Sequence, residues 1–221
     1  MADALASLFD AKALIIVVAG TWLATLARCG WLDMAAAIRA LGQLYGPVFD
    51  ANANRAAMAR SAIVIKERGP LCAETPLPPD PSLAKILASY LTIGSIDALR
   101  QISSSESSAR QMRSEQGRGV FESAGELAPV FGLVGTLFAI TQLMPVQGTG
   151  TGELALAAVG TAVLSSLYGV LTAQFLYLPL ARAIERRSER EERARSDILE
   201  FFESEIAGHN ARRSGKLRPA A

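Results

Sequence analysis

The sequence predicts an all-α integral membrane protein with about three transmembrane helices and a cytoplasmic helical insertion. Of the 221 residues 19% are charged, yet the ranges 127–152 and 154–181 contain no charged residue at all. A third apolar stretch, 13–27, lies near the N-terminus between two basic residues. A helix needs roughly 20 apolar residues to cross a bilayer core, and uncharged windows of about 18 or more usually mark a span.

The first expected span covers 13–28 and follows a short external N-terminal segment, 1–12. The apolar stretch is short, but the flanking basic side chains can reach the interface while their stems stay in apolar surroundings. Trp22 and Trp31 suit an interfacial aromatic belt. Because no basic segment precedes the apolar run, we expect a retained span and not a cleaved signal peptide. A buried helix of a soluble protein is the alternative.

The range 29–126 is a long polar insertion, which we expect to be helical and cytoplasmic. Gly69-Pro70 and the proline-rich stretch 75–81 interrupt it. Ser82 is a plausible N-cap for the helix that resumes there. The segments with helical patterning are Met34–Leu44, Ala53–Lys66 and Asp97–Phe121.

The range 127–181 forms a predicted two-helix channel domain with spans at 127–144 and 154–181. The second of these spans exceeds the thickness of a bilayer core, so it must tilt or protrude. A charged helix, 182–207, continues from it, and we read this helix as solvated. The basic tail 208–221 is predicted to be disordered.

Basic residues predict the orientation. Ten lysines and arginines lie in 29–126 and ten more from Arg182 onward, whereas the loop 145–152 has none. Basic residues next to spans stay in the cytoplasm. We therefore expect the insertion and the C-terminus to be cytoplasmic, and the N-terminus and the loop to be periplasmic.

Several function classes lack support in the sequence. The net charge of +1 gives no reason to expect nucleic acid as a partner. Cys29 and Cys72 are read as structural or incidental thiols, and His209 as a surface histidine. Without a nucleophile–base pair or a metal cluster, we expect no enzyme, no catalytic residue, no metal and no cofactor.

Small residues recur at spacings of three and four in the last two spans, and each set forms a stripe along one helix face. Lipid offers no hydrophobic reward for joining helices, so small residues and hydroxyl groups support their contact. The candidates for helix packing are Gly132, Gly135, Ala162, Gly169 and Ala173.

Three hydroxyl residues, Thr136, Ser165 and Ser166, are candidates for an ion path through these spans. Hydroxyl groups can pass on a proton through water or partly coordinate a sodium ion. Alternatively, each can donate to a carbonyl of its own helix and be inert. Since no acidic residue lies inside any predicted span, a titrating carboxylate must come from a partner chain.

Pro129 and Pro179 lie within the last two spans, where each leaves a carbonyl unpaired and permits a kink. Pro129 could instead be the first residue of a helix. Pro179 cannot, because helical sequence continues on both sides of it.

Three segments resemble the MotA/TolQ/ExbB family, and the flagellar stator A subunits within it. Residues 128–137, APVFGLVGTL, resemble the start of the third helix of those subunits. Residues 158–169, AVGTAVLSSLYG, with 175–181, FLYLPLA, resemble the fourth helix. Residues 14–26, LIIVVAGTWLATL, are similar to the second.

The resemblance implies an inner-membrane ring of A-type subunits, a pentamer in the known cases, surrounded by lipid. Two MotB/ExbD-like single-span subunits would occupy its centre and supply the membrane aspartate. By motif position, Pro129, Thr136, Ser166 and Pro179 match channel or coupling positions of the family, with Ser166 in place of the usual threonine.

The chain departs from the family pattern in two places. By the resemblance, we expect the family's usual first transmembrane helix to be missing from this sequence, because 14–26 is similar to the second. Arg60, Lys66 and Glu67 match the family's rotor-contacting residues only approximately, and Gly69-Pro70 ends that helix early.

The resemblance and the residues together predict a MotA-like subunit of a proton channel or motor that couples ion flow to mechanical work, such as flagellar rotation. One alternative is a TolQ/ExbB-like energiser of envelope transport or integrity. Another is a non-conducting membrane scaffold that has kept only the helix-packing stripe.

Overall fold

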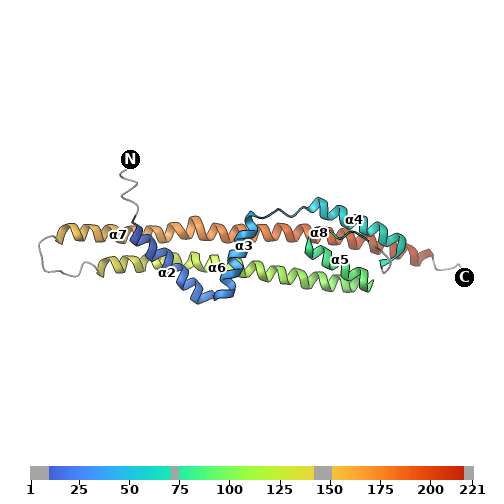
Figure 1. The fold of residues 1–221 in the computed structure, drawn as a ribbon, viewed down its shortest axis with the longest axis horizontal. Helices are drawn as coiled ribbons and strands as arrows, with labels where there is room; N and C mark the ends of the chain where they lie inside the picture. Colours follow the sequence, from blue (N-terminus) through green and yellow to red (C-terminus); the bar gives the residue numbers. More distant parts are fainter. Residues whose placement is uncertain (1–9, 71–74, 142–150, 217–221) are drawn as a thin grey trace. The chain divides into compact units, whose positions relative to one another are not determined.

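The computed structural model describes the backbone of residues 10–70, 75–141 and 151–216, and every regular element in these ranges is helical (Figure 1). The chain divides into two compact units. The first unit comprises residues 1–45 and 113–185, and the second comprises residues 46–112 and 186–221. The all-α prediction is confirmed.

Three helices of the described chain are long and apolar enough to cross a membrane, as predicted. The first is α2 (Ala11–Cys29), and the second is the apolar part of α6 (Ile96–Thr141). The third begins with α7 (Thr151–Leu171) and passes through a π-helical segment, η2 (Thr172–Tyr177), into α8.

Helix α2 is capped at both ends and packs along α7. The Asp10 carboxylate accepts hydrogen bonds from the first backbone N–H groups, and Gly30 at φ 85° ends the helix in a conformation that suits glycine. Its buried stripe has a spacing of four residues and consists of Ala13, Val17, Thr21 and Thr25. The two threonine hydroxyls donate to carbonyls of their own helix, so the stripe contains no unpaired side-chain group.

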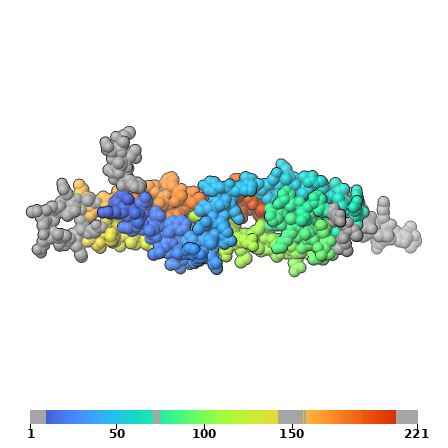
Figure 2. All heavy atoms as spheres, in the orientation of Figure 1, coloured from blue at the N-terminus to red at the C-terminus, as the bar shows by residue number. Residues whose placement is uncertain are grey.

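Helix α3 (Trp31–Tyr45) runs across α6 and the start of α8, and the core of the first unit lies at this crossing (Figure 1). In the space-filling view, α2 and α3 lie over one face of the pair formed by α6 and the helix that runs from α7 into α8 (Figure 2). The main buried residues of this core are Met34, Ala37, Val120, Phe121, Ala124, Ala128, Ala173, Tyr177, Ala181 and Ile184.

The polar segment Asp97–Phe121 and the second span form one continuous helix, α6, of 46 residues. Pro129 lies well inside this helix, so the reading of Pro129 as a first helical residue is wrong. A single proline can be tolerated inside a membrane helix where neighbouring helices support the freed backbone group. Since Pro129 is the only proline between Ile96 and Thr141, the helix continues through it.

In the second unit, α4 (Ala51–Arg68) and α5 (Pro81–Ile93) pack with the first part of α6 and the later part of α8 (Leu178–Lys216). Gly69 at φ 83° ends α4, in line with the predicted break. The core of this unit consists of Met58, Ala62, Ile65, Leu83, Ile86, Leu87, Tyr90, Leu99, Ile198, Leu199, Phe202 and Ile206.

Asp80, and not Ser82, is the N-cap of α5. Its Oδ1 accepts the backbone N–H groups of Ser82 at 3.0 Å and Leu83 at 3.0 Å. Pro81 takes the first helical position, where its missing N–H costs nothing, so the cap must be the residue before it.

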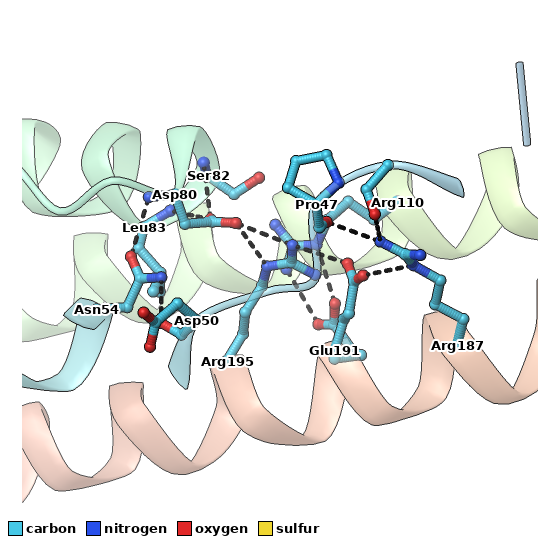
Figure 3. Close-up of polar contacts among 12 residues, drawn as sticks. Pro47, Asp50, Asn54, Asp80, Ser82, Leu83, Arg110, Arg187, Glu191 and Arg195 are labelled. Atoms are coloured by element: carbon cyan, nitrogen blue, oxygen red, sulfur yellow. Dashed lines mark hydrogen bonds and ion pairs between the residues drawn. The ribbon is translucent and has the colours of Figure 1, made fainter. Parts of the chain in front are cut away.

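The same carboxylate binds Arg195 of α8 (Figure 3). Arg195 Nη2 lies 2.9 Å and Nε 3.1 Å from Asp80 Oδ2, while the Asp80 N–H donates to Asn54 Oδ1 of α4 at 2.9 Å. Burial alone would raise the pKa of Asp80, but Arg195 and the two cap bonds together hold that pKa below its ordinary value. Asp80 therefore ties three helices of the second unit together.

Two ion pairs at a spacing of four residues lie along α8, Glu189–Arg193 and Glu191–Arg195. A further fork joins Arg110 of α6 to Glu192 at 2.9 and 3.0 Å. Burial would raise the pKa of Glu192, but the hydrogen bond from Arg110 lowers it, and the net direction is downward.

Candidate ion-path site

The backbones of α6 and α7 meet at glycines. A Cβ added to Gly169 would lie 2.6 Å from the carbonyl oxygen of Ala128 and 3.0 Å from the Cα of Gly132. A Cβ added to Gly135 would lie 2.7 Å from the Cβ of Ser165. No side chain fits into a contact this close. Helices in lipid associate in this way, through small residues that let their backbones approach each other. Of the other two residues expected to pack here, Ala173 is fully buried and Ala162 is partly buried.

Ser165 lies inside this contact. It is fully buried, and its hydroxyl donates to the carbonyl oxygen of Thr161 at 2.8 Å. A hydroxyl committed to its own helix and enclosed by Gly135 has little freedom to bind an ion. The geometry of Ser165 therefore fits helix packing better than ion passage.

Thr136 and Ser166 are both partly exposed. Ser166 borders the glycine contact, since its Cα lies 3.2 Å from a Cβ added to Gly132. Thr136 follows Gly132 by one turn of α6, and its hydroxyl donates to the carbonyl oxygen of Leu133 at 2.6 Å. Both hydroxyls thus lie at the edge of the α6–α7 contact, where a further helix could reach them.

An exposed polar side chain that the sequence reading overlooked, Gln174, lies on the same helix as Ser166. Ser166, Val170 and Gln174 are spaced by four residues, so they share one face of α7 and η2. An amide group inside an uncharged span is costly when it faces lipid. This face therefore needs a protein neighbour or water. The sequence signal that could have identified Gln174 was an amide side chain within the uncharged range 154–181.

Pro179 lies two residues after the end of the π-helical segment η2. The N–H of Leu178 donates to the carbonyl oxygen of Ala173, five residues earlier, as a π-helix requires. A proline ring clashes with the carbonyl four residues before it, here that of Phe175, and a widened turn relieves such a clash. Polar residues at Thr172 and Gln174 thus lie where the helical register changes.

Among the described residues, Asp10 is an acidic residue that contacts a span along its length. Asp10 precedes α2, and its Oδ2 accepts the hydroxyl of Thr161 at 2.8 Å, while its N–H donates to the Tyr168 hydroxyl oxygen at 2.9 Å. Thr161 lies ten residues after the start of α7, which corresponds to roughly 15 Å at the usual helical rise per residue. The other carboxylate oxygen of Asp10 accepts the N–H groups of Lys12 and Ala13. These bonds fix where α2 starts against α7.

The candidate rotor residues on α4 differ in environment. Lys66 forms an ion pair with Glu205 of α8 and is partly buried, whereas Arg60 and Glu67 are exposed. Among the described residues, no cluster of three histidine, cysteine or acidic side chains could hold a metal ion.

These features define a helical membrane protein with a glycine-mediated helix contact and polar side chains along one uncovered face. Comparison with known families gives the same class: residues 78–197, more than half of the chain, match the MotA/TolQ/ExbB proton channel family. The chain belongs to this family.

Similar proteins of known sequence include bacterial motility proteins. The uncharacterized protein YtxD of Bacillus subtilis (strain 168) is 30% identical over 133 residues, which cover 60% of this chain and 48% of YtxD. Motility protein A of the same organism is 28% identical over 52% of this chain and 42% of its own length. The chain thus spans about half the length of these two relatives. Motility protein A of Cereibacter sphaeroides is 26% identical over 96% of this chain and 83% of its own length.

Two solved structures share the fold. The flagellar MotAB stator complex from Bacillus subtilis matches with a TM-score of 0.73 and 21% identity, over 90% of this chain and 80% of that one. The C. jejuni MotAB structure matches with a TM-score of 0.77 and 16% identity, over 97% and 86%.

Proposed function

We propose that this chain is a MotA-like subunit of an inner-membrane proton channel or motor that couples ion flow to mechanical work. The observation that carries the proposal is the uncovered face of α7 and η2, where Ser166 and Gln174 are accessible within a membrane span. Polar groups in a span need a protein or water neighbour. The chain belongs to a proton channel family, which supports the proposal that an ion passes along this face.

The proposal requires a partner. The charge-free ranges contain no carboxylate, and Asp10 is occupied by cap bonds and by Thr161. A single-span, MotB/ExbD-like subunit carrying a membrane aspartate would supply the titrating group and cover the polar face. A ring of five copies around such partners, in the bacterial inner membrane, completes the proposal. MotAB complexes among the structures of the same fold support a partner of this kind.

Proton flux measured in vesicles tests the function. The chain is reconstituted with a single-span, MotB/ExbD-like protein that carries a membrane aspartate, and uptake is followed with a pH-sensitive dye. The double variant Thr136→Val, Ser166→Ala should lower flux to that of protein-free vesicles while the complex still assembles, because the first change keeps side-chain size and the second removes only one hydroxyl group.

Thr141→Val is the matched control, since the Thr141 hydroxyl donates to the carbonyl oxygen of Phe138 just as that of Thr136 donates to Leu133. This control should conduct like the unchanged protein. Undiminished flux in the double variant would contradict the assignment of the two hydroxyls. No flux with any single-span partner would favour a non-conducting scaffold.

A TolQ/ExbB-like energiser is the second candidate. It is favoured by the engagement of Lys66 with Glu205, which leaves fewer of the expected rotor-contacting groups exposed on α4. A peptidoglycan-binding domain on the partner would favour the motor. A motility assay with Arg60→Glu and Glu67→Arg separates the two candidates further, since only a motor subunit that contacts a rotor should lose rotation.

The proposed orientation predicts where reporters will be found. A reporter fused to the C-terminus should be cytoplasmic and one fused to the N-terminus periplasmic, because the basic residues lie in the insertion and in the tail. Alkaline phosphatase and green fluorescent protein fusions at each end measure this. Both ends on the same side of the membrane would exclude three spans.

A further inference from the structure

The linker between α3 and α4, residues 46–50, is bound by side chains of α8. Arg187 Nη2 donates to the carbonyl oxygen of Pro47 at 2.8 Å (Figure 3) and to that of Gly46 at 3.4 Å. Arg187 Nε donates to Glu191 Oε1 at 3.0 Å, so a side chain of the same helix orients the guanidinium group. Because its acceptors in the linker are backbone atoms, Arg187 sets the path of the main chain between α3 and α4.

A second arginine of α8 binds the same linker two turns further on. The guanidinium carbon of Arg195 lies 4.6 Å from the centroid of the Phe49 ring. Glu191 lies between the two arginines in sequence and accepts a hydrogen bond from Arg195 at 3.3 Å as well as that from Arg187. A spacing of four residues places all three side chains on one face of α8. Arg187, Glu191 and Arg195 together form an arginine clamp on the linker.

The first two turns of α4 depend on polar contacts. In the described chain, the apolar core of the second unit includes side chains of α4 from Met58 onward. Before Met58, the carboxylate of Asp50 caps α4 by accepting the N–H of Ala53 at 2.9 Å. The carbonyl oxygen of Asp50 also accepts the side-chain amide of Asn54 at 2.8 Å. Since Asp50 is the last residue of the linker, the arginine clamp determines where α4 begins.

The helix that carries the clamp is the continuation of the third span. The segments α7, η2 and α8 follow one another directly from Thr151 to Lys216. Hydrogen bonds join each turn of a helix to the next, so a displacement of the span is carried along α8. Arg187 therefore ties the linker to the same continuous helix that contains Ser166 and Gln174.

We propose that Arg187 is a positioning residue for mechanical work, which makes the start of α4 follow the movement of the third span. Helix α4 carries the exposed candidate rotor residues Arg60 and Glu67. Without Arg187 the apolar core still holds the later part of α4, but the first turns can shift independently of α8. Arg187 lies outside the charge-free range 154–181, so it should affect mechanical output and not conduction. The inference rests on the proposed motor function.

Arg187→Met tests the proposal, because methionine keeps an apolar stem and removes every donor. Proton flux in the vesicle assay should equal that of the unchanged protein, whereas rotation in the motility assay should fall several-fold. Arg187→Lys retains a charged donor without the planar fork and should restore part of the rotation. Hydrogen exchange of residues 51–57 should rise by about tenfold in Arg187→Met, because hydrogen bonds from a charged group are lost. Exchange of residues 58–68 should be unchanged.

Arg193→Met is the matched control. Arg193 forms an ion pair with Glu189 at 2.9 Å and the same spacing, but within the described chain it binds no residue of the linker. This variant should leave flux, rotation and exchange unchanged. Equal losses of flux and rotation in Arg187→Met would mean that Arg187 supports the channel fold, and undiminished rotation would mean that α4 works without the clamp. Either outcome overturns the proposal.

Hydrogen exchange separates a failure of the clamp from a failure of the proposed function. If the unchanged protein conducts no protons or drives no rotation, the motor proposal fails, and exchange still decides whether Arg187 positions α4. Unaltered exchange of residues 51–57 in Arg187→Met would show that it does not. Faster exchange throughout α4 and α5 would indicate a general loss of stability, which also overturns the positioning role.

Discussion

Gly169→Ala should destabilise the membrane unit formed by α2, α6 and α7, and the proposed ion flux should fall with it. The new Cβ would lie 2.6 Å from the Ala128 carbonyl oxygen and 3.0 Å from the Cα of Gly132. Both are backbone atoms and cannot rotate away, so the helices must separate. Overpacking of this kind costs about 1–3 kcal/mol, and Gly169→Val should cost more. Thermal unfolding in detergent, followed by circular dichroism, measures the loss.

Gly160→Ala is the matched control on the same helix. Gly160 is exposed, and a Cβ added there meets no atom within 4 Å. Since alanine favours a helix over glycine by about 1 kcal/mol, this variant should be neutral or slightly stabilised. The two substitutions are chemically identical and are expected to shift stability in opposite directions. Equal melting temperatures would show that the close contact of α6 with α7 does not limit stability.

The architecture was predictable because the bilayer restricts what a sequence can do. Uncharged ranges identify spans without any knowledge of packing, since only helices satisfy the backbone in lipid. For the same reason the spacing of Gly132, Gly135 and Gly169 indicated a contact face, and the structure places these residues against α7 or α6. Helix ends at Gly69 and near Arg28 also followed from local rules.

Other features depended on tertiary contacts that sequence spacing does not encode. Asp10 is a good N-cap by residue type, but only the placement of α2 halfway along α7 brings it to Thr161. The π-helical segment before Pro179 reflects how the chain relieves the proline, which the sequence reading left as a permitted kink. Ser165 and Ser166 are adjacent, and only the position of Gly135 decides that Ser165 is the enclosed one.

Helix α3 lies between these cases, since some of its apolar residues are buried and others exposed. The pattern in Met34–Leu44 predicted a helix, and Trp31 was read as an interfacial residue. The sequence alone, however, could not show which face the core would take. Once Met34 and Ala37 are buried, Leu32 and Ile38 are left outside, and an ordinary amphipathic helix becomes one with two apolar faces. Packing, and not the spacing of apolar residues, therefore decides which apolar side chains of α3 stay exposed.

Asp80→Ala should destabilise the second unit more than any substitution of an exposed residue does. The Asp80 and Arg195 side chains are only 7% and 12% exposed. Removing one partner of a buried ion pair costs about 3–5 kcal/mol, reduced here because Arg195 keeps Glu191 at 3.3 Å. Loss of the α5 cap adds about 1 kcal/mol. Hydrogen exchange of α5, which belongs to the second unit alone, should rise accordingly.

Glu189→Gln is the matched control, because the Glu189–Arg193 pair lies on the same helix but is 53% and 76% exposed. Exposed pairs contribute at most about 1 kcal/mol, so exchange in α5 should be unchanged. Comparable exchange in the Asp80 and Glu189 variants would contradict the role given to Asp80.

Asp80→Asn separates the charge from the cap, since asparagine also caps helices well. The pKa of Asp80 lies below its ordinary value in the folded chain, so its contribution to stability is complete above the unfolded pKa of about 3.9 and is lost as the pH falls through the folded pKa. The unchanged protein should therefore lose protection of α5 in acid, and Asp80→Asn should show a flatter dependence of protection on pH.

The lowered pKa of Glu192 predicts that some acid sensitivity remains and that Glu192→Gln removes a further part of it. An unaltered pH profile in Asp80→Asn would mean that Arg195 is held by its other contacts, with Glu191 and the Phe49 ring, rather than by Asp80.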